Sequence, residues 1–437
     1  MKVKRFFLSR TSVISFIALL LGAVVAASVI PQEFLATPGE LAAWRQAHPG
    51  FAPWTARLGM HHLFTTPWFA LVLLLALVSL VLSSIEQCRL AFDRTFEVPA
   101  AGGGGEGDSP LSEPDLRARL RRHGYLLVAR GEGVLRFVKH PWGYWGNVLL
   151  HGGMVVVIAS SLLIALTQKR GSLTLFEGEL HLPADPWNFE ENGLLAGSFI
   201  LPEPVRLDRV TPHFRPNHRI SRIVSELSFL PPADGPRRLR LEVNAMASHR
   251  GITIYQSTDV GHAFNVEFTD PSGRREVFRL PISHPESLEE AGYNDFRFPW
   301  LPVKLQAKYL VDAERKSLRS RTPLLTIRMM AGENEAGRAT LRPGESAALG
   351  VYRVRLEGVQ HWTTLIFVEL TGMPGVFAGF FMVVLGTLLA YSTPPRELVA
   401  TAHGRGYLLR WRAAKFAEFY QEERSRLLAG LAGEGEG

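Results

Sequence analysis

Four uncharged, apolar stretches interrupt a chain that otherwise mixes hydrophobic and polar positions as a soluble protein does. Each is about as long as the ~17–25 residues with which an α-helix crosses the hydrocarbon core of a bilayer. They are Val13–Ile30, Trp68–Ile85, Tyr144–Leu166 and Gly375–Tyr391. The pattern predicts four transmembrane helices, and it excludes a soluble enzyme and a disordered chain.

The first stretch also has the basic start of a signal peptide, because four Lys or Arg side chains precede Val13. Its apolar run is longer than the ~7–15 residues of a typical signal-peptide core, and Ile30-Pro31-Gln32 does not form a small-residue cleavage site. We interpret it as an uncleaved helix. Cleavage near Ala26-Ala27-Ser28 is the alternative.

Lys and Arg residues are distributed unevenly over the segments between the apolar runs. Residues 1–12 carry four, 31–67 two, 86–143 nine and 392–437 seven. The positive-inside rule therefore predicts that both ends and the 86–143 segment are cytoplasmic, and that 31–67 and 167–374 lie outside. The net charge of +7 reflects this topology, and no basic stripe with interleaved aromatic residues suggests a nucleic acid partner.

The 167–374 segment predicts a large, all-β extracytoplasmic domain between the third and fourth helices. Short runs with alternating or β-branched residues recur about every 10 residues, which is typical of a sandwich or open barrel. We expect the stretch 181–220, rich in Pro and Asn, to be irregular. The expected strands are Ser225–Leu230, Leu239–Ala245, Ile252–Gln256, Ala263–Thr269, Glu276–Leu280, Lys304–Leu310, Leu324–Met330, Tyr352–Val359 and Leu365–Leu370.

The cytoplasmic segment 86–143 predicts a linker and a small α/β module. Pro99–Pro110 is rich in Gly and is expected to be a flexible linker. A capped helix through Leu116–Arg122 and a hairpin of Tyr125–Ala129 with Val134–Val138 follow. The last segment, 392–437, is expected to be a cytoplasmic tail.

His151 is the only one of the fourteen His residues that lies within an apolar run. An imidazole in hydrocarbon is costly unless it is paired or coordinates a metal, and a neutral imidazole is the commonest protein ligand to haem iron. The competing interpretation is structural. In that case His151 is bonded to Ser79, Ser83 or a backbone carbonyl of a neighbouring helix.

Other candidate residues carry weaker signals. His61-His62 lies just before the second apolar run and could bind a ligand at the outer surface, although such pairs are more often boundary residues. His140 precedes His151 by three helical turns, but Pro141 makes a continuous helix between them doubtful.

The remaining chemistry is sparse. A single Cys, Cys88, excludes an internal disulfide, a Cys-x-x-Cys-His haem attachment and a Cys-rich metal site. No nucleophile elbow, His-Glu-x-x-His motif or P-loop is present, so we find no self-contained catalytic site. The Gly375-x-x-x-Gly379 motif favours close packing of helices.

Several short motifs follow one another in a set order between Ser9 and about Leu398. They are Val29-Ile-Pro-Gln32, Thr66-Pro-Trp-Phe69, Ser84-Ile-Glu-Gln-Cys-Arg89, Tyr144–His151, Leu241-Glu-Val-Asn244, Gly251–Ser257 and Gly372-Met-Pro-Gly375. In this order the chain resembles the ResB family, also called CcsB, of the System II machinery for cytochrome c biogenesis.

The resemblance implies that the chain is one half of a complex in a bacterial plasma membrane. Its partner is a ResC- or CcsA-like membrane protein that carries a tryptophan-rich haem-handling motif, which this chain lacks. The pair is thought to move haem across the membrane and present it to apocytochrome c. In the family, a transmembrane His of this subunit is a proposed axial ligand of haem, and His151 is the position that matches it. Haem b would then bind transiently in the complex, and the isolated chain would hold no cofactor.

The alternative class is a membrane-anchored binding protein or transporter-complex subunit with an external recognition domain. Some export permeases also combine four spans with one large external domain, which usually follows the first span. Here the predicted domain lies between the third and fourth spans, and this position favours the haem-handling interpretation.

Overall fold

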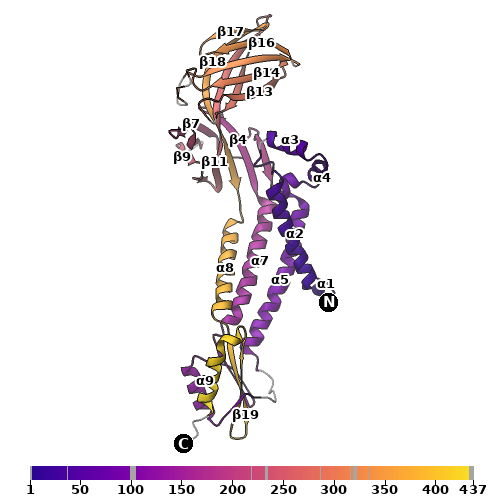
Figure 1. The fold of residues 1–437 in the computed structure, drawn as a ribbon, viewed down its shortest axis with the longest axis vertical. Coiled ribbons are helices and arrows are strands. Elements are labelled where there is room, and N and C mark those ends of the chain that lie inside the picture. The colour runs from indigo at the N-terminus through magenta and orange to yellow at the C-terminus, as the bar shows by residue number, and fades with distance from the viewer. Residues whose placement is uncertain are drawn as a thin grey trace. The chain divides into compact units, whose positions relative to one another are not determined.

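A computed structural model describes residues 2–36, 38–98, 105–217, 219–231, 235–285, 287–314, 316–317, 322–332 and 334–432. The chain divides into two compact units. The helical unit comprises Met1–Leu166 and Thr371–Gly437, and the β unit comprises Thr167–Leu370 (Figure 1).

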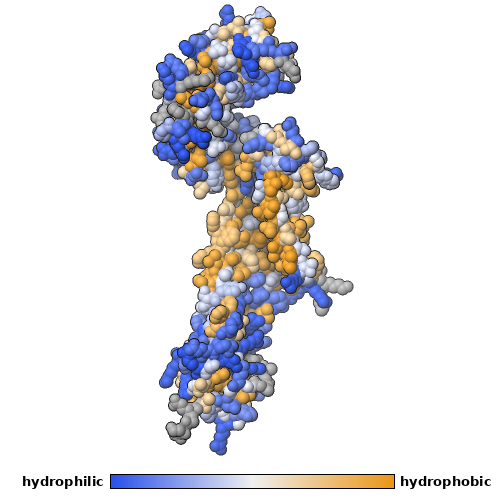
Figure 2. Space-filling view, in the orientation of Figure 1, coloured by the Kyte–Doolittle hydropathy of each residue, from blue (hydrophilic) through white to orange (hydrophobic). Residues whose placement is uncertain are grey.

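Four helices of the helical unit are long and apolar enough to cross a membrane, as the sequence predicts. They are α2 (Arg10–Val29), α5 (Pro67–Phe96), α7 (Gly143–Thr167) and α8 (Met373–Ser392). Only 11 to 22% of each helix's most apolar window is buried, and hydrophobic surface gathers over these helices (Figure 2). The apolar side chains therefore need an environment outside the chain, such as lipid or a partner.

Helix α5 extends beyond the apolar run that predicts it. The run ends at Ile85, whereas the helix continues to Phe96, because no Gly or Pro interrupts the polar residues that follow. Short helices complete this part of the unit. They are α1 (Lys2–Phe7), α3 (Pro38–Ala47), α4 (Ala52–Arg57) and η1 (Met60–Thr65).

Helices α7 and α8 run side by side with their backbones in contact (Figure 1). A Cβ atom added to Gly153 would lie 2.7 Å from the carbonyl oxygen of Gly379, and one added to Gly146 would lie 2.5 Å from the amide nitrogen of Ala390. Both distances are too short for any side chain. The Gly375-x-x-x-Gly379 motif therefore serves packing within the chain.

The sheet of the helical unit contains strands that precede the β unit in the sequence and strands that follow it. Its five strands have the order β1-β20-β19-β3-β2, all antiparallel. The elements are β1 (Gly107–Ser109), α6 (Glu113–Arg122), β2 (Leu126–Gly131), β3 (Val134–Lys139), β19 (Arg396–His403), β20 (Gly406–Ala413), η2 (Ala417–Tyr420) and α9 (Gln421–Leu431). We call β1–β3, β19, β20, α6 and α9 the small module.

Two expectations for this region are corrected. Residues 392–437 do not form a separate tail, because β19 pairs with β3 and Leu427 and Leu431 enter the module's core. The end of the Pro99–Pro110 segment is also not linker, because β1 pairs with β20. Residues 99–104 of that segment lie outside the described residues.

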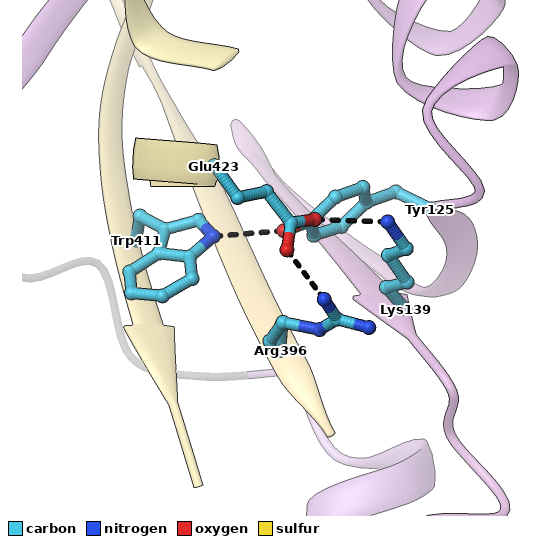
Figure 3. A network of polar contacts seen from close by, with 5 residues as sticks. All are labelled: Tyr125, Lys139, Arg396, Trp411 and Glu423. Carbon is cyan, nitrogen blue, oxygen red and sulfur yellow. Dashed lines mark hydrogen bonds and ion pairs between the residues drawn. The ribbon is translucent and has the colours of Figure 1, made fainter. Parts of the chain in front are cut away.

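In the small module, a network of polar contacts surrounds Glu423 (Figure 3). Its carboxylate accepts a hydrogen bond of 2.9 Å from Lys139 Nζ and forms an ion pair with Arg396. Burial opposes ionisation of Glu423, but these two cations outweigh it and hold the pKa below its ordinary value. Beside it, Trp411 donates to the hydroxyl of Tyr125, a side chain that is 1% exposed.

We predict that Glu423→Ala destabilises the small module by roughly 1–3 kcal/mol, because two largely buried cations lose their shared partner. Thermal unfolding of the purified chain in detergent, together with proteolysis near residue 400, measures the loss. The neighbouring carboxylate of Glu422 is 83% exposed, so Glu422→Ala is the matched control. Equal melting temperatures for both variants would contradict this role of Glu423.

The β unit is organised around two long antiparallel strands, β11 (Ile252–Thr269) and β18 (Tyr352–Glu369). They are central in a seven-stranded sheet that also contains β4, β6, β10, β12 and β17. Two further sheets have four strands each, in the orders β13-β14-β15-β16 and β5-β7-β8-β9. The other strands are β4 (Lys169–Phe176), β5 (Leu180–His181), β6 (Phe189–Asn192), β7 (Val205–Phe214), β8 (Ile220–Phe229), β9 (Arg237–Glu242), β10 (Ala247–His249), β12 (Arg275–Ser283), β13 (Gly292–Phe298), β14 (Leu301–Leu310), β15 (Leu324–Ala331), β16 (Asn334–Leu341) and β17 (Ser346–Leu349).

Each half of the β11–β18 pair contributes to a different hydrophobic core. Phe264, Phe268 and Leu356 pack with β12 and the β13–β16 sheet. Ile254 and Phe367 pack with β4 and with the β7–β9 strands. The β unit therefore consists of two lobes that share two strands.

Three sequence expectations for the β unit are wrong. The pattern predicts a break between Ile252–Gln256 and Ala263–Thr269, and another between Tyr352–Val359 and Leu365–Leu370. Each pair is one continuous strand. Between the runs, His262 and Thr363 are buried, and an irregularity in register between Gln256 and Val260 keeps the pairing intact although Thr258 and Asp259 are exposed. The stretch 181–220 is also not wholly irregular, because it contains β6 and β7.

Candidate functional site

One face of α7 carries the candidate ligand His151. Because seven residues make nearly two helical turns, Tyr144, His151, Ile158 and Ala165 lie on the same face. We call these four residues the α7 seam. At the Ala165 end the seam is closed, since Ala165 and Ile158 belong to a hydrophobic cluster with residues of α2 and α5. Those residues are Ala23, Phe69 and Leu73.

His151 is only partly buried, and its own helix fixes its tautomer. The Nδ1 atom lies 2.9 Å from the carbonyl oxygen of Asn147. Because a carbonyl can only accept, Nδ1 carries the proton in the neutral ring and Nε2 presents a lone pair. No hydrogen bond to Nε2 is found among the described residues.

The structural interpretation of His151 finds little support in these contacts. Ser79 donates its hydroxyl to the carbonyl of Phe7, at 2.7 Å, and not to the imidazole. The carbonyl that His151 does bond belongs to its own helix, so this hydrogen bond joins no two helices. An imidazole that donates one N–H to a carbonyl while its other nitrogen is open has the usual arrangement of a metal ligand.

His151 does not belong to a cluster of metal-ligating side chains in the part of the chain that the structure describes. Within the described ranges, no group of three or more His, Cys, Asp or Glu residues is arranged to hold a metal ion. An imidazole can instead occupy one axial position of a haem whose four equatorial nitrogens come from the porphyrin. The arrangement around His151 fits that single-ligand role.

His61, the other candidate next to an apolar run, has a structural role. It is 3% exposed, and its Nδ1 donates to the carbonyl of Pro31 at 2.9 Å while Nε2 lies 3.3 Å from Thr55 Oγ1. Because both ring nitrogens have hydrogen-bond partners, His61 connects Pro31, which follows α2, with Thr55 in α4. Its neighbour His62 is exposed.

His140 does not share a helix with His151. Its φ of 59° places it in the left-handed region, and α7 begins only at Gly143, after Pro141. Burial, together with the charges of Arg396 and Lys139, lowers the pKa of His140. The doubt raised by Pro141 about a continuous helix is therefore confirmed.

The β unit contains a histidine cluster that the sequence analysis missed. His262 on β11 is paired in register with His361 on β18, and their ring centroids are 4.6 Å apart. His284, just after β12, places its ring centroid 5.5 Å from that of His262. The hydroxyl of Tyr309 lies 3.2 Å from His262 Nδ1. These residues are 22 to 99 positions apart in sequence, so only strand register could have revealed the cluster.

Burial dominates the electrostatics of the cluster. It lowers the pKa of His262 well below 6.5, and the nearby His361 and His284 lower it further. Burial also lowers the pKa of His284 to about 4. Glu177 lies 3.4 Å from His361 Nδ1, and the hydrogen bonds from His361 and the Val210 amide outweigh its burial and keep its pKa below the ordinary value.

We predict that the β unit loses stability as pH falls below about 6.5 towards 4. In the folded state His262 and His284 bind protons more weakly than in the unfolded state, so acid favours unfolding. The loss should grow from pH 6.5 to 5, as these imidazoles take up protons in the unfolded state but not in the folded state. Thermal unfolding of the full chain across this range measures it.

His262→Phe removes the most buried imidazole of the cluster and should flatten this pH dependence. His403→Phe, a change at an exposed His of the small module, should leave it as in the wild type. A wild-type unfolding temperature that is constant from pH 7.5 to 5 would show that the cluster does not titrate as described.

The fold and the apolar helices define the class of protein. The chain is a membrane protein with four apolar helices and a large β unit that lies between the third and fourth of them in the sequence. A model of the ResB-like family matches residues 9–414. The chain therefore belongs to the ResB-like family.

Similar curated proteins carry names from cytochrome c biogenesis. "Cytochrome c biogenesis protein CcsB" of Gloeobacter violaceus is 23% identical over 403 residues, covering 84% of this chain and 78% of that protein. The protein of the same name from a Synechococcus strain is 25% identical over 403 residues, covering 83% of this chain and 78% of its own length. The similarity thus extends over both units.

Proposed function

We propose that this chain is a haem-handling subunit of a cytochrome c biogenesis complex in the bacterial plasma membrane. It works with a CcsA- or ResC-like membrane protein, moves haem across the membrane and presents it to apocytochrome c. Membership of the ResB-like family and the names of the relatives support this role.

The observation that carries the proposal is the state of His151. Its Nδ1 proton is directed to the carbonyl of Asn147, so Nε2 is free for iron. In this role His151 supplies one axial ligand to haem b and the partner supplies the rest of the site. Because the chain contributes a single ligand, haem is held transiently in the complex, and the isolated chain holds none.

The charge distribution supports an orientation for the subunit. Residues 1–12, the 86–143 segment and the end of the chain are rich in Lys and Arg, which supports a cytoplasmic location for the small module. The β unit is then extracytoplasmic, on the side where apocytochromes are matured. His151 lies in the half of the membrane nearer the cytoplasm.

We predict that His151→Gly leaves the complex assembled but lowers its haem content and its yield of matured cytochrome c by roughly tenfold or more. Free imidazole should partly restore both, because it fits the cavity left by the side chain and can occupy the vacant axial position. Haem per purified complex, read from the Soret absorbance, is the measurement. Normal haem content in the variant would refute the ligand role.

Gly153→Leu is the matched structural control, two residues along the same helix. Its side chain would collide with the backbone of α8 at Gly379, so this variant should lose assembly. Imidazole should not rescue it. If His151→Gly behaves in the same way as Gly153→Leu, His151 is a packing residue.

Reporter fusions test the orientation. A reporter joined near Pro299 should be active only if it functions outside the cytoplasm, and one joined near residue 104 only if it functions inside. The reverse pattern at either site would overturn the proposed topology and, with it, the assignment of the β unit to the outside.

A further inference from the structure

Helix α4 and the two residues that flank it expose a row of large apolar side chains. Phe51, Trp54 and Leu58 are 70%, 64% and 46% exposed, and both flanking residues have helical backbone angles. At 3.6 residues per turn these three side chains cover about 60° of the helix circumference. The buried Thr55 lies on one side of them and the exposed Arg57 on the other. We call Phe51, Trp54 and Leu58 the α4 stripe.

The α4 stripe is held at the level where helix α5 begins its apolar run. The indole Nε1 of Trp68, the second residue of α5, donates a hydrogen bond of 2.9 Å to the carbonyl oxygen of Leu58. The large apolar side chains of α5 are exposed from Leu71 onward, less than one turn further along. The stripe therefore lies where the polar surface of this unit meets the surface of its apolar helices.

The segment between α2 and α5 is fastened to both helices, which keeps the stripe at this level. Gln32 Nε2 donates to the carbonyls of Ile30 and Met60, at 2.9 Å each. Leu63 of η1 is fully buried in the cluster formed with α2 and α5. Element η1 in turn contacts α4, which lies beside the end of α2 that is farther from α1 (Figure 1).

The charge around the stripe suits an anionic surface. The chain has no Asp or Glu between Leu41 and Ile85, and its two basic side chains there are Arg45 and Arg57. Arg45 lies 3.5 Å from the carboxylate of Glu33. Arg57 is exposed, and it forms no ion pair with any residue that the structure describes. Its guanidinium group is thus available to a phosphate.

We propose that the α4 stripe binds lipid at the membrane–water interface, with Arg57 on a lipid phosphate. Aromatic side chains collect at this depth because their rings are apolar while the indole N–H can still form a hydrogen bond. Interfacial segments bind through apolar area together with the attraction between basic side chains and anionic lipids. Lipid is the occupant because the stripe is fixed beside the first turn of an apolar helix. This inference goes beyond the proposed function, since the surface needs neither haem nor a partner subunit.

Quenching of Trp54 by brominated lipid tests the depth of the stripe. The full chain is placed in nanodiscs whose lipids carry bromine either near the headgroup or near the ends of the acyl chains. Because the chain has nine Trp residues, the Trp54 emission is taken as the difference between the wild type and Trp54→Phe. Bromine near the headgroup should quench this emission at least about twofold more strongly than bromine at the chain ends.

Trp300 provides the matched control for the quenching experiment. Its ring packs against Phe278 within the β unit. Its emission, obtained in the same way from Trp300→Phe, should be insensitive to bromine at either depth.

The choice of headgroup tests Arg57. Brominated phosphatidylglycerol and brominated phosphatidylcholine are each added as a minor component to otherwise identical nanodiscs. The anionic lipid should quench Trp54 about twofold more than the zwitterionic lipid, because it is enriched beside a free basic side chain. Arg57→Gln should remove this preference. Arg45→Gln should retain it, because the arginine it replaces already has a carboxylate partner.

Three results would overturn the proposal. Absence of quenching at both depths would leave the stripe in water. Quenching that disappears when the CcsA- or ResC-like partner is co-expressed would make the stripe a subunit interface. Equal quenching by the two headgroups in the wild type would remove the phosphate contact of Arg57. Melting temperatures of Trp54→Phe and Arg57→Gln within a few degrees of the wild type exclude unfolding as the cause, because both side chains are exposed.

Discussion

The backbone contact between α7 and α8 is the constraint on which the rest of the protein depends. Glycines allow the two helices to approach to a distance that no side chain would permit. At one end of this pair, β3 precedes α7 and β19 follows α8, and these strands pair. At the other, β4 follows α7 and β18 precedes α8, and these strands pair as well, with Lys169 opposite Glu369. The two-lobed β unit is therefore inserted between α7 and α8 in the sequence, and β3 and β19 on either side of this helix pair still pair with each other.

The same helix pair determines how α7 presents its other face. With α8 along the glycine face, the α7 seam is turned to α2 and α5 at its Ala165 end, where apolar side chains close it. At the other end the imidazole of His151 keeps a free nitrogen, and Tyr144 lines a polar cavity together with three arginines and three carboxylates.

Imidazoles occur within both units, but their surroundings give them different chemistry. His262 is enclosed by two other imidazoles and a tyrosine, so protonation is resisted and the ring acts as a buried, uncharged packing group of the β unit. His151 donates one proton to its own helix and is otherwise open. Because His262 is buried on all sides, it is a structural residue that affects stability. Because one ring nitrogen of His151 is open, His151 is suited to metal coordination.

By itself, the sequence determined the four apolar helices, the β-rich character of the insertion, the one histidine within a span and the family resemblance. These follow from local patterns, since the length of an uncharged run and the alternation of residues are read without knowledge of contacts. Only the tertiary structure decided the rest. Pairing across about 84–117 residues merged two predicted strand pairs into β11 and β18 and brought His262 to His361. Pairing across more than 250 residues folded residues 392–437 onto β3. The cavity beside Tyr144 likewise joins α5, β3, α7, β19 and β20. Such features depend on strand register and on which distant segments pair in a sheet. The residue periodicity of a single segment does not reveal its partner, because the periodicity is the same for every partner.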